Sequence, residues 1–125
     1  MHKITNECAY QLTRQQRLVE AKDYEYVFAQ PCKLTDRYLT ILARSNDRVF
    51  GRLGLAIAKK RVAKAVDRNR IKRLIRESFR HHQLTLAGWD CVVLVRNGVT
   101  QVNNCTLLNS LTWHWQQLPC RCKKS

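Results

Sequence analysis

The chain has 125 residues, of which 23 are Lys or Arg and 9 are Asp or Glu, giving a formal net charge of +14 at pH 7. At this length we expect one domain around one hydrophobic core, and the apolar fraction of 45% excludes a disordered basic tail. A folded domain with this charge attracts polyanions, which are an anionic membrane, an acidic protein or, most commonly, nucleic acid.

The cysteines and apolar runs bear on compartment and metal binding. The start of the chain lacks the apolar run of a secretory signal, and the longest such runs, residues 91–95 among them, do not exceed five residues. We therefore expect a soluble, cytoplasmic protein. Because the cytosol is reducing, the six cysteines are not expected to form a disulfide framework. We expect Cys91 and Cys105 to be small buried side chains, the pair Cys120 and Cys122 to be incidental, and no metal to be bound, since a one-residue gap is too short for zinc.

The first half of the domain is predicted to contain one helix and two strands. After an arm over residues 1–18, a helix over residues 20–30 ends before Pro31 and places Tyr24 and Phe28 on one face. Alternating patterns predict strands over residues 38–44 and 52–59. One face of the second strand carries only small residues, which favours the close approach of a packed helix over that of a ligand; these are Gly54, Ala56 and Ala58.

The densest charge lies between residues 59 and 80, where ten basic and two acidic side chains carry eight of the fourteen net charges. From Val66 onward a helical wheel separates the apolar residues Ile71, Leu74, Ile75, Ser78 and Phe79 from an almost wholly cationic face. Surface helices usually mix both signs of charge. The like charges on this face repel one another, which points to a bound polyanion that offsets the repulsion. Guanidinium groups favour phosphate over lipid. The predicted RNA-binding residues are Lys59, Lys60, Arg61, Lys64, Arg68, Asn69, Arg70, Lys72, Arg73, Arg76 and Arg80.

The last third of the chain is predicted to supply a central strand and a second helix. Residues 89–96 form a nearly continuous run of β-branched side chains, which is typical of a strand buried on both faces. Residues 103–118 form an amphipathic helix that Pro119 ends, and residues 119–125 form a short basic tail. The predicted core residues of this helix are Leu107, Leu108, Leu111, Trp115 and Leu118.

The run from Lys59 to Arg80, centred on Arg68-Asn69-Arg70-Ile71-Lys72-Arg73, resembles the signature of the bacterial ribonuclease P protein subunit. The resemblance covers residues 17–118 and includes the aromatic pair of the first helix and Trp89-Asp90 before an apolar strand. It implies an α/β (α+β) sandwich of a four-stranded sheet and about three helices, like the second domain of ribosomal protein S5. It also implies a left-handed βαβ crossover through the basic helix, an exception to the usual right-handed rule.

In that family the catalyst is an RNA, and the protein is a cofactor that helps the RNA bind precursor tRNA and remove its 5′ leader. The resemblance therefore implies no catalytic residue in this chain, one protein per catalytic RNA, and Mg²⁺ held at the RNA active site. It makes residues 19–118 an RNA-binding α/β domain and places the basic motif of that domain, centred on residues 68–73, against the catalytic RNA. It places Tyr24, Phe28 and Leu42 in a cleft for the single-stranded leader, with Leu42 where relatives can carry an aromatic residue.

The residues leave two other functions open. A structural RNA-binding protein of the ribosome would share the charge and the style of fold. The alternative role of Tyr24 and Phe28 is plain core packing, since aromatic side chains at this spacing are often core residues. A protein nuclease is disfavoured, because the nine carboxylates are scattered along the chain and form no obvious pair of metal sites. The adjacent His81 and His82 point to different faces of a helix and lack a positioned partner for acid–base catalysis.

Overall fold

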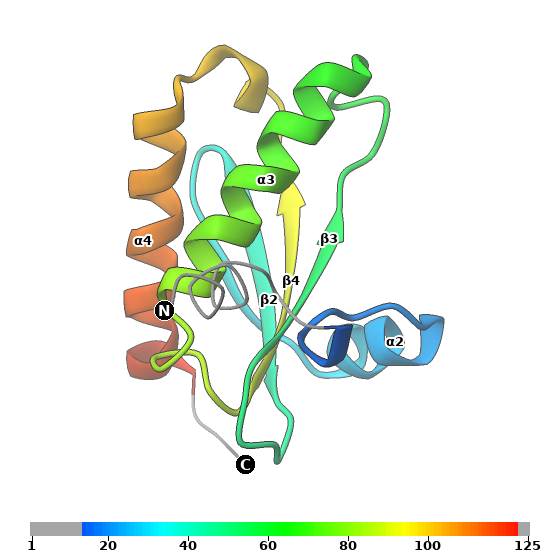
Figure 1. Cartoon of the computed structure of the whole chain (residues 1–125), viewed down its shortest axis with the longest axis vertical. Helices are drawn as coiled ribbons and strands as arrows, with labels where there is room; N and C mark the ends of the chain where they lie inside the picture. The colour runs from blue at the N-terminus through cyan, green and yellow to red at the C-terminus, as the bar shows by residue number, and fades with distance from the viewer. Residues whose placement is uncertain (1–13, 123–125) are drawn as a thin grey trace, which may run out of the picture.

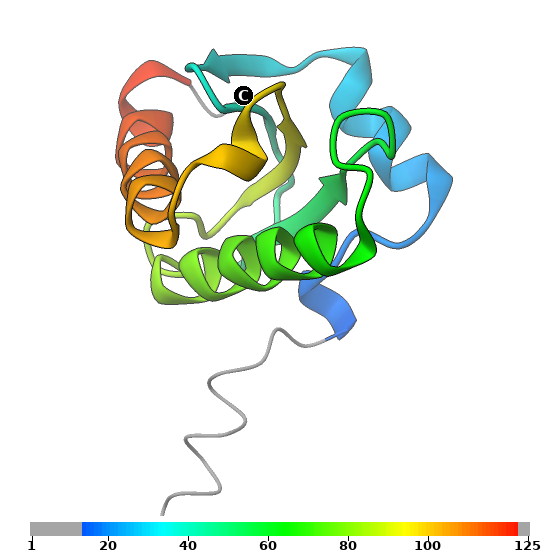
Figure 2. The ribbon, with the colours of Figure 1, turned by 90° about the horizontal axis from the view of Figure 1, so that it is seen from above.

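The computed structural model describes residues 14–122, and this part of the chain folds into a four-stranded mixed sheet with helices on both faces (Figures 1 and 2). In the order β1-β2-β4-β3, only β3 and β4 run parallel, and the long helix α3 connects them. Helices α3 and α4 pack on one face of the sheet and α2 on the other. This confirms the predicted fold class. The elements are η1 (Arg14–Gln16), α2 (Ala21–Ala29), β1 (Cys32–Thr35), β2 (Leu39–Ser45), β3 (Arg52–Ala56), α3 (Ala65–His81), β4 (Trp89–Val95), η2 (Val99–Gln101) and α4 (Asn104–Arg121).

Strand β4 is central and buried on both faces, as its run of β-branched residues predicts. Cys91 and Val93 face α3 and α4 in the main core, whereas Val92 faces α2 in a smaller cluster with Leu18 and Val27. Strand β2 alternates strictly between buried and half-buried residues, because only one of its faces meets the main core. The sheet therefore separates two apolar layers, a large one and a small one.

Helices α3 and α4 form the large layer with the sheet. All five residues that the helical wheel assigns to the apolar face of α3 are buried. On α4, four of the five predicted core residues are fully buried, and Leu108 is half-buried. The rings of Phe79 and Trp115 meet edge to face with centroids 5.7 Å apart, and Trp115 Nε1 donates to Ser78 Oγ at 2.8 Å. Ser78 thus satisfies the buried indole N–H.

Two element boundaries differ from the sequence predictions. Helix α4 continues through Pro119 to Arg121. Proline costs a helix one hydrogen bond, and here the last turn is held by burial of Leu118 and Cys122 and by a bond from the Cys122 N–H to the Leu118 carbonyl at 2.8 Å. Strand β3 ends at Ala56, three residues early. No helix in residues 14–122 has the length and apolar character needed to cross a lipid bilayer.

A disulfide joins Cys32 on β1 to Cys122 at the end of α4, with 5.8 Å between their Cα atoms. The prediction of no disulfide is therefore wrong, as is the view of Cys122 as incidental. The pairing depends on packing α4 against the β1 edge, which brings together residues that are 90 positions apart. Cys91 is buried as predicted, but Cys105 is exposed because it lies in the first turn of α4. Cys8 and most of the predicted arm lie outside the described residues.

Candidate nucleic-acid interface

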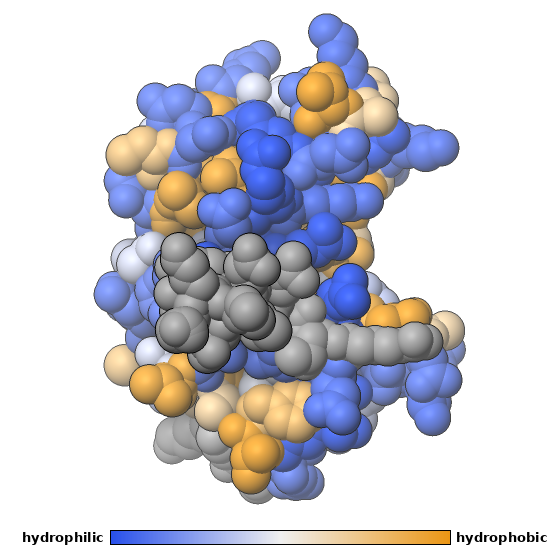
Figure 3. All heavy atoms as spheres, viewed as in Figure 1, coloured by the Kyte–Doolittle hydropathy of each residue, from blue (hydrophilic) through white to orange (hydrophobic). Residues whose placement is uncertain are grey.

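The basic face of α3 is positioned by the burial of its opposite face. Because the apolar residues of the helix pack on the sheet and α4, the cationic residues point outward. In the loop before the helix, Lys59, Lys60, Arg61 and Lys64 are all exposed. Figure 3 shows hydrophilic side chains gathered over α3 in the upper half of the molecule. The structure thus brings the predicted basic residues of the loop and the helix onto one surface.

Two arginines of the basic motif have partners within the domain. Arg68 Nη1 donates to the carbonyls of Val62 and Ala63, at 3.0 and 2.8 Å, and so holds the loop against the helix that follows it. Arg70 Nη1 donates to Asn104 Oδ1 at 2.5 Å, which links α3 to the start of α4. Both side chains therefore shape the surface as well as contributing charge.

Three other cations of the helix lack such partners. Within residues 14–122, Lys72, Arg73 and Arg76 make no hydrogen bond or ion pair. The nearby Glu77, which the sequence pairs with Arg73, forms no such pair in the structure. Unneutralised like charges on one helix destabilise the isolated domain. The positive potential of these three side chains suits a surface that binds phosphates.

The aromatic residues of α2 lie on the other face of the sheet. Val27 is fully buried, whereas Tyr24 is half-buried and Phe28 is 45% exposed. The two rings lie with centroids 6.3 Å apart, and Leu42 and Tyr24 both pack beside the small cluster that Val27 forms with the sheet. Of these residues, Val27 is the one that is fully buried. The other three form a partly exposed apolar surface, which we name the α2 surface.

The small-residue face of β3 accommodates Tyr24. A Cβ atom placed on Gly54 would lie 2.8 Å from Tyr24 Cε1, which is closer than atoms of this kind approach. The Tyr24 hydroxyl lies at hydrogen-bond distance from the N–H of Leu55, at 3.2 Å, and from its carbonyl, at 3.5 Å. At Gly54 the close neighbour is therefore a side chain of helix α2, as expected, whereas Ala58 lies beyond the end of β3 and is exposed.

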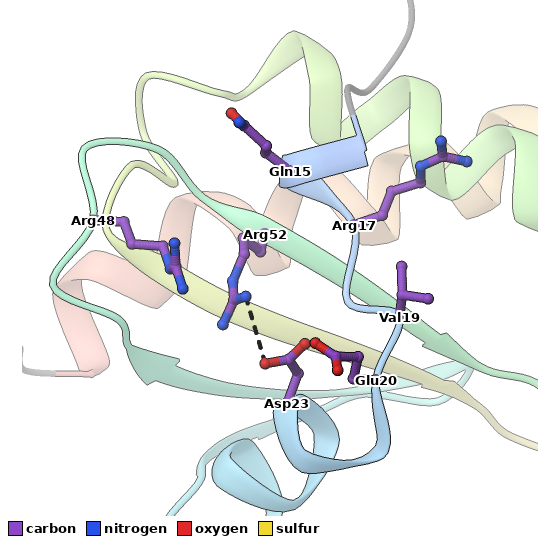
Figure 4. Close-up of a pocket in the computed structure, with 7 residues that line it drawn as sticks. All are labelled: Gln15, Arg17, Val19, Glu20, Asp23, Arg48 and Arg52. Carbon is purple, nitrogen blue, oxygen red and sulfur yellow. Dashed lines mark ion pairs between the residues drawn. The ribbon is translucent and has the colours of Figure 1, made fainter.

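A buried ionic network fixes α2 at the start of strands β3 and β4. Asp90 is fully buried and accepts bonds from Arg52 Nε at 2.8 Å and Nη2 at 2.5 Å, and from Asn46 Nδ2 at 2.8 Å. The hydrogen bonds with Asp90 raise the pKa of Arg52 above its ordinary value. Asp23 on α2 lies 3.6 Å from the same guanidinium (Figure 4). Sequence reasoning missed this network, because its members lie on four separate segments.

The two histidines after the basic motif do not form a catalytic pair. His82 Nδ1 lies 2.8 Å from the Ser78 carbonyl, whereas His81 Nε2 lies 3.0 Å from Arg80 Nη2 on the outside of the helix. Among residues 14–122, no three His, Cys, Asp or Glu side chains gather into a group suited to a metal ion.

The comparisons with known proteins agree with one another. The Ribonuclease P family model matches residues 12–119. The chain is 47% identical over 116 residues to the ribonuclease P protein component of Methylococcus capsulatus, a match that covers 93% of this chain and 91% of that protein. It is also 47% identical over 106 residues to the ribonuclease P protein component of Pseudomonas aeruginosa, a match that covers 84% of this chain and 78% of that protein.

Solved structures give the same result. The RNase P protein of Staphylococcus aureus superposes with a TM-score of 0.76 at 25% identity and covers 85% of this chain and 97% of its own. The RNase P protein of Thermotoga maritima, in complex with 1-(4-fluorophenyl)-2-thiourea, superposes with a TM-score of 0.75 at 29% identity and covers 81% and 98%.

Proposed function

Since the chain belongs to the ribonuclease P protein family and is a component of that endoribonuclease, we propose that it binds the catalytic RNA through the basic loop and helix α3. We further propose that it holds the single-stranded 5′ leader of precursor tRNA on the α2 surface. The protein then binds and positions RNA, and the RNA subunit carries out the cut. The observation that carries this proposal is the outward cationic face of α3, on which Lys72, Arg73 and Arg76 form no ion pair within the described residues.

The physical role of the basic face is to neutralise phosphates. Each phosphate contact releases condensed counterions, so affinity for the catalytic RNA falls steeply with salt. Arginine adds bidentate hydrogen bonds to phosphate oxygens, which fix the orientation of the protein on the RNA. Lower repulsion between the two RNAs also lets the substrate bind at a lower Mg²⁺ concentration than the RNA alone requires. We assign the binding of Mg²⁺ to the RNA active site, because in this family the RNA is the catalyst.

The physical role of the α2 surface is to accept unstacked bases. Phe28 presents a ring that is 45% exposed, and the Tyr24 ring stands beside it, backed by Gly54. Stacking of a base on such a ring contributes about 1–3 kcal/mol and tolerates different sequences. Leader binding is therefore expected to depend on aromatic area more than on base identity.

A reconstitution assay tests the function. The protein is mixed with ribonuclease P RNA and a precursor tRNA at low Mg²⁺, and formation of the mature 5′ end is followed. We expect cleavage to require the RNA and to be accelerated by the protein. A protein that fails to accelerate it is not a cofactor, and one that cleaves without the RNA is a nuclease. A ribosomal RNA-binding protein would bind RNA and leave cleavage unchanged.

Two variants separate the surfaces. Arg73→Ala removes one exposed cation and is expected to weaken binding to the catalytic RNA and to lower the slope of log Kd against log salt by about 1. Phe28→Ala is expected to weaken binding only of substrates that carry a leader. The matched controls are Arg37→Ala, at the β1–β2 turn, and Trp113→Ala, an exposed aromatic on α4. Equal loss with Phe28→Ala for substrates with and without a leader contradicts the role of the α2 surface.

A further inference from the structure

Three cations converge on a small pocket at the edge of strand β3. The pocket has a volume of about 150 Å³ and lies between α2 and α3. Its lining combines three basic side chains with a tyrosine and an apolar wall: Arg17, Lys72, Arg76, Tyr24, Leu18, Leu53 and Leu55. Lys72 and Arg76 belong to the basic face of α3, and Tyr24 belongs to the α2 surface. The third cation, Arg17, was not among the predicted binding residues.

Arg17 is held at this place by its backbone. It forms a parallel bridge with Leu53, and the N–H of the next residue, Leu18, donates to the Leu53 carbonyl at 2.9 Å. Leu18 itself is buried in the small apolar cluster. The segment thus continues the sheet beyond β3 and carries the Arg17 side chain on a fixed backbone. A fixed backbone reduces the entropy that is lost when the side chain binds a ligand.

The charges around this pocket are not neutralised. No Asp or Glu lines the pocket, and in the described part of the chain Arg17, Lys72 and Arg76 form no ion pair or side-chain hydrogen bond. A neighbouring pocket, which Arg17 also lines, gives the contrast, because Arg52 and Arg48 are there accompanied by Asp23 and Glu20 (Figure 4). In the same view the Arg17 guanidinium extends away from these carboxylates, toward α3. An anion is therefore favoured in the first pocket and disfavoured in the second.

The size and lining of the pocket define the anion. At about 150 Å³ it is smaller than the roughly 300 Å³ at which ligand pockets for whole small molecules begin. It suits a group such as one phosphodiester, which accepts hydrogen bonds from several cations at once. Tyr24 belongs both to this pocket and to the α2 surface, so a strand whose bases stack there would pass its backbone along the cations.

We propose that Arg17, Lys72 and Arg76 bind one phosphodiester of the single-stranded leader at the β3 edge. Arg17 is thereby a substrate-binding residue that connects the α2 surface with the basic face of α3. The inference rests on the proposed function, because it takes the leader of precursor tRNA as the strand that is bound.

The test pairs a protein substitution with a substrate change. The holoenzyme is assembled with wild-type protein, Arg17→Gln or the control Arg37→Gln, which removes the same charge from the opposite edge of the sheet. Binding is measured for precursor tRNAs in which each leader phosphodiester in turn is replaced by a neutral methylphosphonate, and for a tRNA without a leader.

With wild-type protein and with Arg37→Gln, we expect about a tenfold loss of affinity at one leader position. Arg17→Gln should bind the unmodified substrate more weakly and should lose clearly less than tenfold at that position, because one of the three cationic partners of the phosphodiester is already absent. Binding of the tRNA without a leader should stay within twofold. Thermal unfolding shows whether Arg17→Gln is folded. If it is not, Lys72→Gln is tested in its place for the same coupling with the methylphosphonate substitution.

The outcomes separate the inference from the proposed function. If the wild-type holoenzyme processes the leader but Arg17→Gln leaves affinity unchanged, the inference is overturned and the function stands. Equal loss with and without a leader also overturns it, since the pocket would then bind the catalytic RNA. If the wild-type protein does not stimulate cleavage at all, the proposed function fails and the inference fails with it.

Discussion

Replacing Asp90 with Asn tests whether the buried ionic network fixes the α2 surface. The Asp90 carboxylate is fully buried, and its oxygens accept two bonds from Arg52 and one from Asn46. Asparagine keeps the shape of the side chain but removes its charge and turns an N–H₂ group toward one of the donors. The Arg52 side chain, which is 12% exposed, then lies in a site that has lost its main counterion.

The expected loss of unfolding free energy in Asp90→Asn follows from the geometry of the ionic network. Removing one partner of a buried, hydrogen-bonded ion pair destabilises a protein by about 3–5 kcal/mol, because the other charge is left buried. Asp23 remains 3.6 Å from the guanidinium and compensates in part, so we expect the lower end, about 3 kcal/mol. This is a large share of the roughly 5–15 kcal/mol that stabilises a domain of this size.

Urea unfolding, followed by tryptophan fluorescence and circular dichroism, measures the loss. Asp23→Asn is the matched control, since it removes a carboxylate beside the same guanidinium from a site that is 19% exposed. We expect that control to cost about 1 kcal/mol or less. A loss below about 1 kcal/mol for Asp90→Asn, or equal losses for both variants, would refute the assignment of the network as the anchor of α2.

Three further predictions concern other contacts. Reduction of the Cys32–Cys122 disulfide, or its replacement by serines, should lower the free energy of unfolding by about 2–4 kcal/mol, because the bond closes a loop of some 90 residues; identical urea midpoints with and without reductant would contradict this. Burial lowers the pKa of His114 more than the neighbouring Asp36 raises it, so stability should fall as pH drops below about 6.5, by at most about 1.4 kcal/mol per unit, and His114→Gln should flatten that slope. Gly54→Ala should cost about 1–3 kcal/mol by displacing the α2 tyrosine and should weaken binding of leader-bearing substrates only, as competition assays with leaderless tRNA will show.

The predicted loss of stability through His114 has a defined pH range, because the neighbouring Asp36 titrates at lower pH. Burial raises the pKa of Asp36, but hydrogen bonds from Ser110 and from the N–H groups of Leu39 and Tyr38 together outweigh it and lower the pKa below its ordinary value. Its contribution to stability is therefore retained above pH 4 and lost only in stronger acid. Between pH 5 and 7 the slope that His114→Gln removes belongs to the histidine.

The elements whose patterns are local and strong could be predicted from the amino-acid sequence alone. The buried and cationic faces of α3 follow from a 3.6-residue period sustained over 17 residues. Strand β4 follows from a run of β-branched residues, and the end of α2 follows from Pro31. These features depend on neighbours along the chain, which is why the position of the basic surface could be predicted without coordinates.

Features that join distant segments follow only from the tertiary structure. Strand β1 has four residues, too few for a pattern, and exists through its pairing with β2. Pro119 was read as the end of a helix because the sequence does not show that the turn after it is anchored by Cys122. Arg17 became a candidate ligand-binding residue only when the backbone bridge to Leu53 set it beside α3. The local sequence pattern predicts which face of an element is apolar. Packing of the whole domain determines which elements contact one another, and the contacts that complete a site form between those elements.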